Sequence, residues 1–241
     1  MKAGSIRLVI FFLVLALSFN YGVLVGVYKV FPYEQLIALK QFFQPPSQSG
    51  WRNNEHRIQI FEEFSTPASV VFVGDSIIEA GEWSDFFPSL RTANRGVGSD
   101  TSVDVLNRLD SIISVNPKIA FLMFGINDIY KGIPIEVTLE NYSVIVSKLK
   151  DEEISVISFS TIQCQLSNCG KEKVAAINSL NTELESLSDD YDFPLIFLPK
   201  LSNKKGLDAR YTYDGVHLTS LGYRNWVDEM RKVLQSDIEW E

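Results

Sequence analysis

The chain has 241 residues, of which 46% are hydrophobic and 22% are charged, and its formal net charge at pH 7 is −8. This length is enough for one sizeable hydrophobic core but not for two ordinary domains with linkers, and the composition is that of a globular protein. The negative charge argues against nucleic acid or an anionic membrane surface as a partner of the globular part.

The first part of the chain is much more apolar than the rest. Residues 8–28 contain no charged side chain. About 20 helical residues, at roughly 1.5 Å each, span the roughly 30 Å hydrocarbon core of a bilayer. We therefore expect residues 1–31 to form an uncleaved signal anchor, a transmembrane helix. The alternatives are a signal peptide cleaved near Ala16-Leu17-Ser18, which would give a secreted protein, and a buried helix of the globular domain.

Flanking charges and cysteine usage both indicate that the main body is exported. Lys2 and Arg7 precede the apolar segment and Lys29 follows it, which favours a cytoplasmic N-terminus and a body on the periplasmic or extracellular side. Cys164 and Cys169 lie in a polar stretch that is typical of a loop, and in an oxidising compartment they could form a disulfide. The alternative is two free thiols. No metal site is expected, because no histidine lies nearby to complete a ligand set.

Residues 32–67 are expected to link the anchor to the globular domain. The stretch 45–50, Pro-Pro-Ser-Gln-Ser-Gly, breaks any helix and is typical of a juxtamembrane spacer. The apolar spacing over 52–64 predicts a lead-in helix before the first strand. His56 lies in a polar part of that helix and is interpreted as a solvated residue.

From residue 68 to residue 241, buried-strand patterns alternate with helical ones. Strands are expected at 69–73, 91–94, 118–124, 154–159 and 195–198. Helices are expected at 102–113, 134–150, 171–187 and 220–234. Such alternation implies a parallel sheet with right-handed crossovers. The predicted fold class is α/β, a three-layer α/β/α sandwich of the flavodoxin type with a five-stranded parallel sheet.

A possible nucleophile follows the first strand in the sequence Gly74-Asp75-Ser76. Open α/β sheets place their ligand sites at the carboxyl ends of the strands. A serine hydroxyl is a weak nucleophile alone and needs a base, which in turn needs an orienting acceptor. Of the two histidines, His217 is the candidate base, and Asp214, three residues earlier, could accept its ring N–H. In the alternative interpretation Asp214 only begins a turn and His217 packs at a helix start.

Two further stretches lie at predicted strand ends. Asn127, directly after the third strand, could donate its side-chain amide to a developing oxyanion, although asparagine also favours turns. The loop 94–101, Asn-Arg-Gly-Val-Gly-Ser-Asp-Thr, contains glycines that let backbone N–H groups approach a ligand. It lacks the spacing of a dinucleotide or phosphate loop, so nucleotide binding is not expected.

Together these residues resemble the SGNH hydrolases of the GDSL esterase/lipase superfamily, over about residues 68 to 236. The resemblance implies that Ser76 is the nucleophile, His217 the base, Asp214 its partner and Asn127 an oxyanion donor, with no cofactor. The amino-acid sequences of the loops are most similar to those in the branch of platelet-activating-factor acetylhydrolase-like proteins and carbohydrate acetylesterases.

One position departs from the family pattern. The family's second block usually has a glycine before the aspartate, and its backbone N–H serves the oxyanion hole. Here Ser99 stands there, with Gly98 before it. We expect the oxyanion hole to consist of the backbone N–H groups of Ser76 and Ser99 and the amide of Asn127.

The substrate pocket is the least determined part of the prediction. Asp75, Gly98 and Trp83 are assigned to it, although Trp83 could instead pack on the sheet. The predicted activity is hydrolysis of short-chain acyl esters, with acetyl esters of carbohydrate or lipid outside the cytoplasm as substrates. The alternatives are an O-acyltransferase acting on surface glycan, a thioesterase or lysophospholipase, and an inactive glycan-binding module. Neither nucleic acid nor a partner protein is expected.

Overall fold

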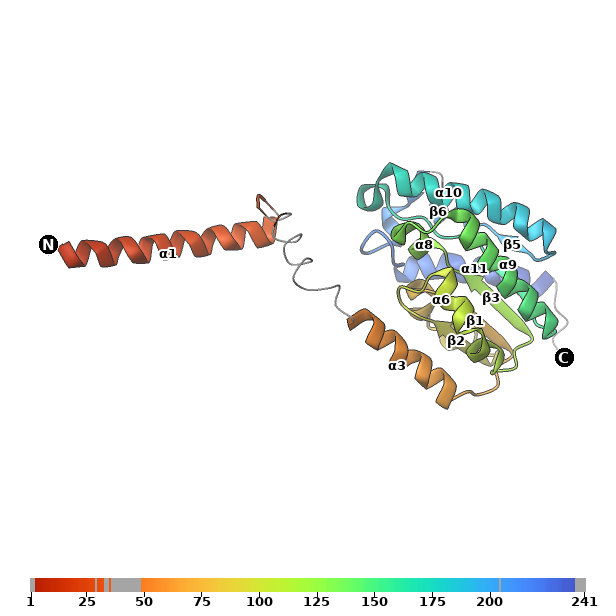
Figure 1. Cartoon of the computed structure of the whole chain (residues 1–241). Helices are drawn as coiled ribbons and strands as arrows, with labels where there is room; N and C mark the ends of the chain where they lie inside the picture. The colour runs from red at the N-terminus through yellow and green to blue at the C-terminus, as the bar shows by residue number, and fades with distance from the viewer. Residues whose placement is uncertain (1–2, 29, 33–34, 36–48, 204, 237–241) are drawn as a thin grey trace. The chain divides into compact units, whose positions relative to one another are not determined.

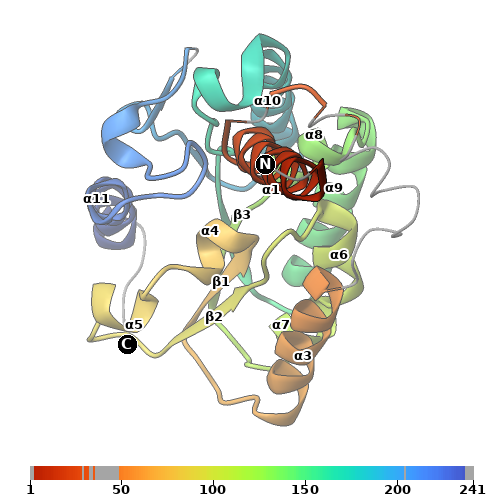
Figure 2. The ribbon, with the colours of Figure 1, turned by 90° about the vertical axis from the view of Figure 1, so that its left-hand side faces the viewer.

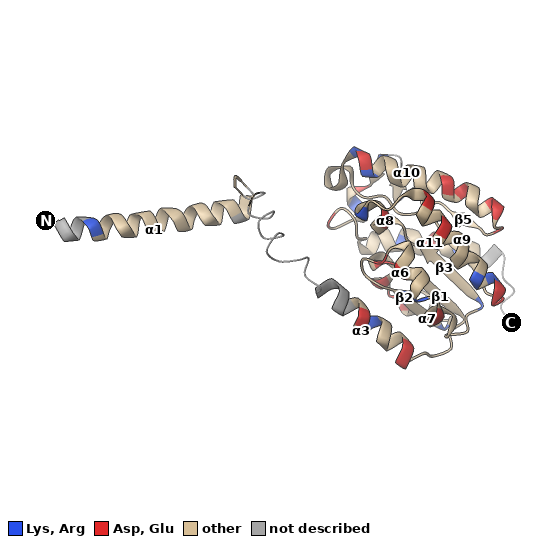
Figure 3. Ribbon diagram, viewed as in Figure 1, with Lys and Arg blue, Asp and Glu red and all other residues tan. Residues whose placement is uncertain are grey.

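The chain divides into two compact units, Met1–Ser49 and Gly50–Glu241. Its computed structural model describes residues 3–28, 30–32, 35, 49–203 and 205–236. Helix α1 (Ala3–Tyr28) is the main element of the first unit, and its ribbon carries no charged residue after Arg7 (Figures 1 and 3). The stretch Arg7–Val25 has a mean hydropathy of 2.5 and is 6% buried.

These properties make α1 long and apolar enough to cross a membrane. Low burial contradicts the alternative of a buried core helix, because such a helix hides its apolar side chains within the protein. A signal sequence meets the same criteria of length and composition, so both an anchor and a cleaved peptide agree with the structure.

The second unit is built on a five-stranded parallel sheet, which confirms the predicted fold class. Its strands are β1 (Val70–Gly74), β2 (Thr92–Gly96), β3 (Ile119–Met123), β4 (Ser155–Phe159) and β5 (Leu195–Ile196). They lie in the order β2-β1-β3-β4-β5, which is the order of flavodoxin-like sheets. The chain passes from β1 to β2 on one side of β1 and then returns to β3 on its other side. The carboxyl ends of β1 and β3 therefore form a switch point, where ligands bind in such folds.

Successive residues of the central strands point into two different apolar layers. Val70 and Phe72 of β1 belong to one cluster of buried side chains, whereas Val71 and Val73 belong to the other. Helices α5 (Trp83–Phe86) and α11 (Ser220–Ser236) contribute to the first cluster. The other face is covered by α6 (Ser102–Asn107), α7 (Leu109–Ile113), α9 (Ile135–Asp151) and α10 (Leu166–Asp190). Figure 2 shows the helices on the two sides of the sheet, which gives the three predicted layers.

The remaining elements are short, apart from the lead-in helix. Helices α4 (Ser76–Glu79) and α8 (Ile126–Lys131) follow β1 and β3 directly, and α3 (Ser49–Glu63) precedes β1. Between β5 and α11 lie a two-stranded antiparallel ribbon, β6 (Ser202–Asn203) and β7 (Gly206–Leu207), and a 3-10 helix, η1 (Ala209–Tyr211).

Some predicted boundaries differ from the structure. The single helix predicted over 102–113 is two helices that meet at Arg108. Helix α10 starts at Leu166 and is kinked at Gly170, where φ is 78° and ψ is 168°. The cysteine stretch that was expected to be a loop therefore contains a helical turn, and Cys164 and Cys169 form the predicted disulfide.

The lead-in helix α3 lies in the second unit, although the sequence grouped it with the spacer. Its Phe61 is 5% exposed. The guanidinium carbons of Arg57 and Arg95 lie 5.1 and 4.4 Å from the centre of the Phe61 ring. Arg95 belongs to the edge strand β2, so this stacking holds α3 against that edge of the sheet.

Candidate active site

Ser76 begins helix α4 immediately beyond the end of β1. Gly74 is the last residue of that strand, and a Cβ atom there would overlap the carbonyl oxygen of Met123 in the neighbouring β3. Asp75 caps the helix, because its Oδ1 accepts a hydrogen bond of 2.9 Å from the N–H of Ile77. The sequence Gly-Asp-Ser thus makes a tight strand-to-helix turn that places the serine at the carboxyl end of the sheet.

Asp75 itself does not reach the surface. The residue is 0% exposed, and its Oδ2 has no hydrogen-bond partner among the described residues. Burial raises the pKa of Asp75 to about 7, against the opposing effects of the Ile77 N–H and of His217. The structure therefore places Asp75, which was assigned to the substrate pocket, beneath the turn, where its carboxyl group caps α4.

The structure brings Ser76, His217 and Asp214 together in one chain of hydrogen bonds. Ser76 Oγ lies 2.8 Å from His217 Nε2. His217 Nδ1 lies 2.6 Å from Asp214 Oδ2. The other carboxylate oxygen, Oδ1, accepts the backbone N–H groups of Val216 and His217 at 2.9 and 2.8 Å. This is the arrangement in which an imidazole, oriented by a carboxylate, can take a proton from a serine.

Hydrogen bonding keeps the Asp214 carboxylate ionised. Partial burial favours its neutral form, but the hydrogen bonds from the His217 ring and from the two backbone N–H groups outweigh that effect and lower the pKa of Asp214 to about 2. The two side chains remain open to water, with 31% of His217 and 40% of Asp214 exposed.

The loop that carries Asp214 and His217 is tied to the start of α10. The Gly215 carbonyl accepts a hydrogen bond of 2.7 Å from the N–H of Gln165, and Asn168 Nδ2 donates to the Asp214 carbonyl at 2.9 Å. Gly215 has a φ of 94° and abuts the Asn168 side chain, so a larger residue would not fit there. The Cys164–Cys169 disulfide encloses both Gln165 and Asn168 and thereby braces the support of this loop.

The segment Gly96–Asp100, which we call the oxyanion loop, lies against Ser76. A Cβ atom placed on Gly98 would be 3.9 Å from Ser76 Cβ. The N–H of Gly98 is already donated to Glu79 Oε2 at 2.5 Å, whereas the N–H of Ser99 has no hydrogen bond within the part of the chain described. Ser99 adopts a left-handed conformation with a φ of 64°, which explains why a glycine suits this position.

Asn127 is bound to the same loop from the opposite side. It lies in α8, behind Gly125, whose φ of 118° turns the chain at the end of β3. Its Nδ2 donates to the Asp100 carbonyl at 2.9 Å. An amide nitrogen carries two hydrogens, so one N–H of Asn127 is used to hold the loop and the other remains for a ligand.

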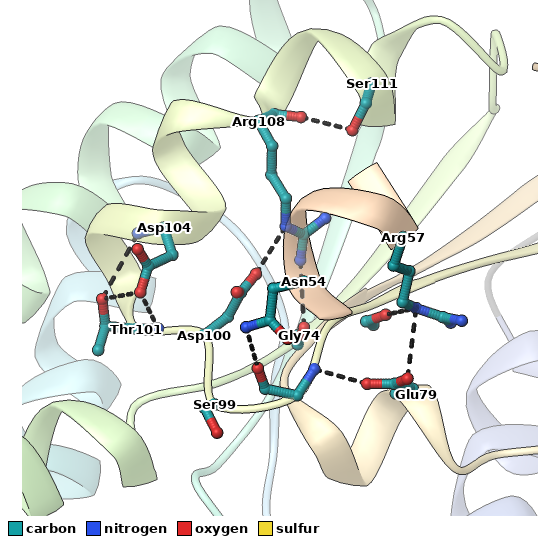
Figure 4. Close-up of polar contacts among 12 residues, drawn as sticks. Asn54, Arg57, Gly74, Glu79, Ser99, Asp100, Thr101, Asp104, Arg108 and Ser111 are labelled. Carbon is teal, nitrogen blue, oxygen red and sulfur yellow. Dashed lines mark hydrogen bonds and ion pairs between the residues drawn. The ribbon is translucent and has the colours of Figure 1, made fainter. Parts of the chain in front are cut away.

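A buried ion pair that was not predicted from the sequence supports the oxyanion loop. Arg108 Nε binds Asp100 Oδ2 at 2.7 Å, and Arg108 Nη2 donates to the Gly74 carbonyl at 3.2 Å (Figure 4). The side chains of Arg108 and Asp100 are 2% and 4% exposed. Burial raises the pKa of Asp100 to about 6, even though the Arg108 charge and hydrogen bond lower it. Eight residues separate the partners in sequence, and no spacing rule would have paired them.

Asp128 was likewise not identified, although it directly follows Asn127. Its carboxylate accepts hydrogen bonds from the N–H and Oγ of Ser102 and from Thr138 Oγ1. Burial raises its pKa, and the hydrogen bonds from Ser102 and Thr138 oppose the rise. Asp128 therefore joins α8 to α6 and α9 behind the oxyanion loop.

Trp83 lies away from the site, in the core. It is 2% exposed, stacks on Phe72 with ring centres 4.1 Å apart, and donates its Nε1–H to the Ile78 carbonyl at 2.9 Å. The structure therefore places Trp83, which was assigned to the substrate pocket, in the core against the sheet. Gly98, the third residue assigned to the substrate pocket, lies next to Ser76.

Comparison with known proteins gives consistent results. Residues 72–224 match the family model described as the GDSL-like Lipase/Acylhydrolase family. The structure of a GDSL-like lipase from Bacteroides thetaiotaomicron is 24% identical, with 77% of this chain and 98% of that chain covered and a TM-score of 0.67. An acetylxylan esterase from Geobacillus stearothermophilus, solved as a catalytic mutant, is 14% identical over 73% of this chain and 97% of that chain, with a TM-score of 0.61.

Two curated relatives extend the comparison. Subunit alpha1 of platelet-activating factor acetylhydrolase IB from Rattus norvegicus is 27% identical over 182 residues, which are 72% of this chain and 77% of the relative. An N-acylneuraminate cytidylyltransferase from Streptococcus agalactiae is 26% identical over 178 residues. That match includes 70% of this chain but only 41% of the cytidylyltransferase, so the chain corresponds to a part of it.

The family match extends over more than half of the chain, and the fold agrees with the structures of family members. Both agree with the predicted resemblance to SGNH hydrolases and with an enzyme that hydrolyses ester bonds. The chain belongs to the GDSL-like lipase/acylhydrolase family.

Proposed function

We propose that the chain is a serine esterase that hydrolyses short acyl esters, chiefly acetyl esters, through an acyl-enzyme on Ser76. The observation that carries the proposal is the hydrogen-bonded chain from Ser76 Oγ through His217 to Asp214, with links of 2.8 and 2.6 Å. Because Asp214 is ionised at neutral pH, it accepts the Nδ1–H of His217 and leaves Nε2 as the base.

In the acylation step, Ser76 Oγ attacks the ester carbonyl carbon while its proton passes to His217 Nε2. The tetrahedral intermediate collapses when His217 returns that proton to the leaving alkoxide oxygen, and the alcohol departs. Water then gives a proton to His217 and attacks the acyl carbon. The bond to Ser76 breaks, the serine regains its proton, and the carboxylic acid is released.

The negative oxygen of each intermediate would be held by three donors: the N–H of Ser76, the N–H of Ser99 and the remaining N–H of Asn127. The first two are backbone groups without a hydrogen-bond partner in the described chain, and the third belongs to an amide fixed by Asp100. Donors that are fixed before the reaction stabilise developing charge without a cost of reorganisation.

The names of the relatives support acetyl groups and carbohydrate. One similar structure is an acetylxylan esterase and one relative belongs to an acetylhydrolase. Another relative is named for N-acylneuraminate, a sugar acid. An anchor in α1 and a disulfide both support a body outside the cytoplasm, where acetylated surface glycans occur. If α1 is cleaved as a signal peptide, the same enzyme is secreted.

The exposure of the site favours hydrolysis over acyl transfer. His217 and Asp214 are 31% and 40% exposed, so water can reach an acyl group on Ser76. The O-acyltransferase alternative needs a sugar hydroxyl to displace that water. A thioesterase or lysophospholipase would use the same residues, and only its substrates separate it from an acetylesterase. The intact chain of hydrogen bonds argues against an inactive glycan-binding module.

A direct test compares the full chain and Ser76→Ala in detergent micelles. Each is given para-nitrophenyl acetate, para-nitrophenyl butyrate, a long-chain ester, an acyl thioester and an acetylated glycan. We expect turnover that requires Ser76 and favours acetate, with release of acetic acid from the glycan. Equal turnover by Ser76→Ala would overturn the proposal, and transfer of the acetyl group to added polysaccharide would identify an acyltransferase.

A further inference from the structure

Side chains from separate elements hold the oxyanion loop by its carbonyl groups. The donors and their acceptors are Arg57 Nε to Gly96 O at 2.6 Å, Asn54 Nδ2 to Gly98 O at 2.6 Å, Lys131 Nζ to Ser99 O at 3.0 Å and Asn127 Nδ2 to Asp100 O at 2.9 Å. Backbone carbonyl groups are thus engaged, while the N–H of Ser99 stays unpaired among the described residues.

The two bonds from α3 come from one face of that helix. Asn54 and Arg57 are three residues apart and therefore point the same way. Together with Glu79 they surround Gly98: Asn54 binds its carbonyl, Glu79 accepts its N–H, and Arg57 lies 3.6 Å from Glu79 Oε1 (Figure 4). Both polar groups of the Gly98 backbone are consequently fixed by side chains.

The ion pair in this arrangement is the weaker part. The side chains of Arg57 and Glu79 are 29% and 37% exposed, and ion pairs that are open to water contribute little to stability. The hydrogen bonds to the backbone matter more, because they fix the loop in one position relative to Ser76. Gly98 lies next to Ser76, so a shift of the loop would move the neighbouring Ser99 N–H relative to the reacting carbonyl.

Ser99 needs this support because of its backbone conformation. A residue with a side chain is disfavoured in the left-handed region because its Cβ atom crowds the backbone, and Ser99 has a φ of 64°. A residue keeps such a conformation only where contacts with the surrounding structure fix it. The contacts on Gly98 act on the residue directly before Ser99.

We propose that helix α3 is a positioning element of the active site, in which Asn54 and Arg57 keep the Ser99 N–H aligned as an oxyanion donor. This inference rests on the proposed esterase function and extends it. It makes the segment before β1, which the sequence grouped with a spacer, a working part of the catalytic unit.

The test uses the full chain in detergent, with Asn54→Ala, Arg57→Ala and two comparison variants. Gln59→Ala removes an exposed amide from the same helix and is the matched control. Arg57→Lys keeps a charge and one donor. We measure kcat and KM for para-nitrophenyl acetate, the melting temperature, and amide hydrogen exchange in peptides that contain residues 96–100.

We expect Asn54→Ala and Arg57→Ala to lower kcat by about 10-fold to 100-fold, because a misplacement of about 1 Å can cost about 100-fold. KM should stay nearly constant, and exchange should rise in the oxyanion loop alone. Gln59→Ala should match the wild type, and Arg57→Lys should recover part of the loss. A merely structural role would instead raise exchange throughout the unit.

A double-variant cycle separates positioning from general destabilisation. Glycine adopts the left-handed region without strain, so Asn54→Ala should lower kcat less in a Ser99→Gly background than in the wild type. Fully additive losses would overturn the inference.

The outcomes also separate failure of this inference from failure of the proposed function. If the wild type turns over acetate through Ser76 and the α3 variants match Gln59→Ala, the function stands and the inference is wrong. If the wild type shows no turnover that requires Ser76, the proposed function is wrong, and unchanged exchange in the loop of Asn54→Ala would overturn the positioning role as well.

Discussion

Two carboxylates of the site, Asp214 and Asp100, are each paired with a basic side chain. The first pair is partly exposed to water and the second is buried. Asp214 is 40% exposed and holds His217, three residues away, at 2.6 Å. The side chain of Asp100 is 4% exposed and holds Arg108, eight residues away, at 2.7 Å. Hydrogen bonds lower the pKa of Asp214 to about 2 against partial burial, whereas burial raises the pKa of Asp100 to about 6 against its arginine.

The difference shows how the site divides its work. In the proposed mechanism, the exposed pair orients a base that must meet substrate and water, so we expect it to contribute to the reaction rather than to folding. The buried pair ties the oxyanion loop to the end of β1 through the Gly74 carbonyl, so its contribution is to the fold and through it to geometry. Substitutions at the two carboxylates should therefore affect different quantities.

The largest expected effect is that of Asp214→Asn on turnover. Loss of the carboxylate leaves His217 without its acceptor and favours the wrong ring tautomer, and we expect kcat to fall by about 10⁴-fold, as in other serine triads. The free energy of unfolding should change less than in Asp100→Asn, because the side chain is exposed and an asparagine oxygen can still accept the N–H groups of Val216 and His217. Steady-state kinetics and urea denaturation measure the two quantities, with Asp228→Asn, in an exposed pair with Arg231, as the control. A variant that keeps its activity would remove Asp214 from the mechanism.

Asp100→Asn should mainly lower the free energy of unfolding, whereas Asp214→Asn should mainly lower turnover. It leaves the buried Arg108 without its counter-charge, which typically costs about 3 to 5 kcal/mol of stability. Urea denaturation would measure this loss against Glu229→Gln, where the partner Lys232 is 65% exposed and the expected loss is about 1 kcal/mol or less. If Asp100→Asn were as stable as Glu229→Gln, the buried pair would have no structural role.

Asp75 should make the stability of the protein fall as pH rises. Its pKa is raised from 3.8 to about 7 in the folded state, so the folded protein binds the proton more tightly than the unfolded chain. The stabilisation is complete below pH 4 and is lost as the pH rises through 7. Asp75→Asn removes this titration, and we expect its stability relative to the wild type to increase by roughly 3 kcal/mol between these pH values.

Denaturation of both proteins at a series of pH values tests this expectation. Asp100 and Asp128 are present in each protein, so only the part of their titration that depends on the charge of Asp75 remains in the difference. A difference that does not change with pH would show that Asp75 is ionised in the folded protein.

The smallest expected effect concerns the disulfide. Replacing Cys164 and Cys169 by serine removes a constraint on a short loop, which is worth about 2 kcal/mol. Because Gln165 and Asn168 hold the Asp214 loop, we also expect a modest loss of kcat. Thermal denaturation and kinetics with and without reductant measure both effects in the wild type, and the double variant should not respond to reductant. A response to reductant in the double variant would assign the effect to another group.

The contrast between the two carboxylates also explains what the sequence could predict. The strands were recognisable because buried parallel strands are continuous apolar runs, as in Val70–Val73. The pair Asp214 and His217 was recognisable because its partners are three residues apart and local geometry joins them. Ser76 and Asn127 are far apart in the sequence, and it was the family resemblance that assigned both to one site.

Long-range contacts could not be predicted in the same way. Asn54 and Gly98 are 44 residues apart, and Arg57 and Gly96 are 39 apart, so only the folded chain reveals them. The location of Trp83 could not be predicted, because aromatic side chains occur both in binding pockets and in cores. Its stacking on Phe72 depends on the packing of the folded chain. Asp75 was assigned to the pocket because it lies next to Ser76 in the sequence, but its side chain caps α4 and is buried.

The most direct measurement of the central claim is reaction of the full chain with a fluorophosphonate, followed by peptide mass spectrometry. If Ser76 is a nucleophile activated by His217, the peptide that contains Ser76 gains one phosphonyl group, and Ser76→Ala and His217→Ala remain unlabelled. Labelling of a different residue, or equal labelling of Ser76 in His217→Ala, would contradict the account.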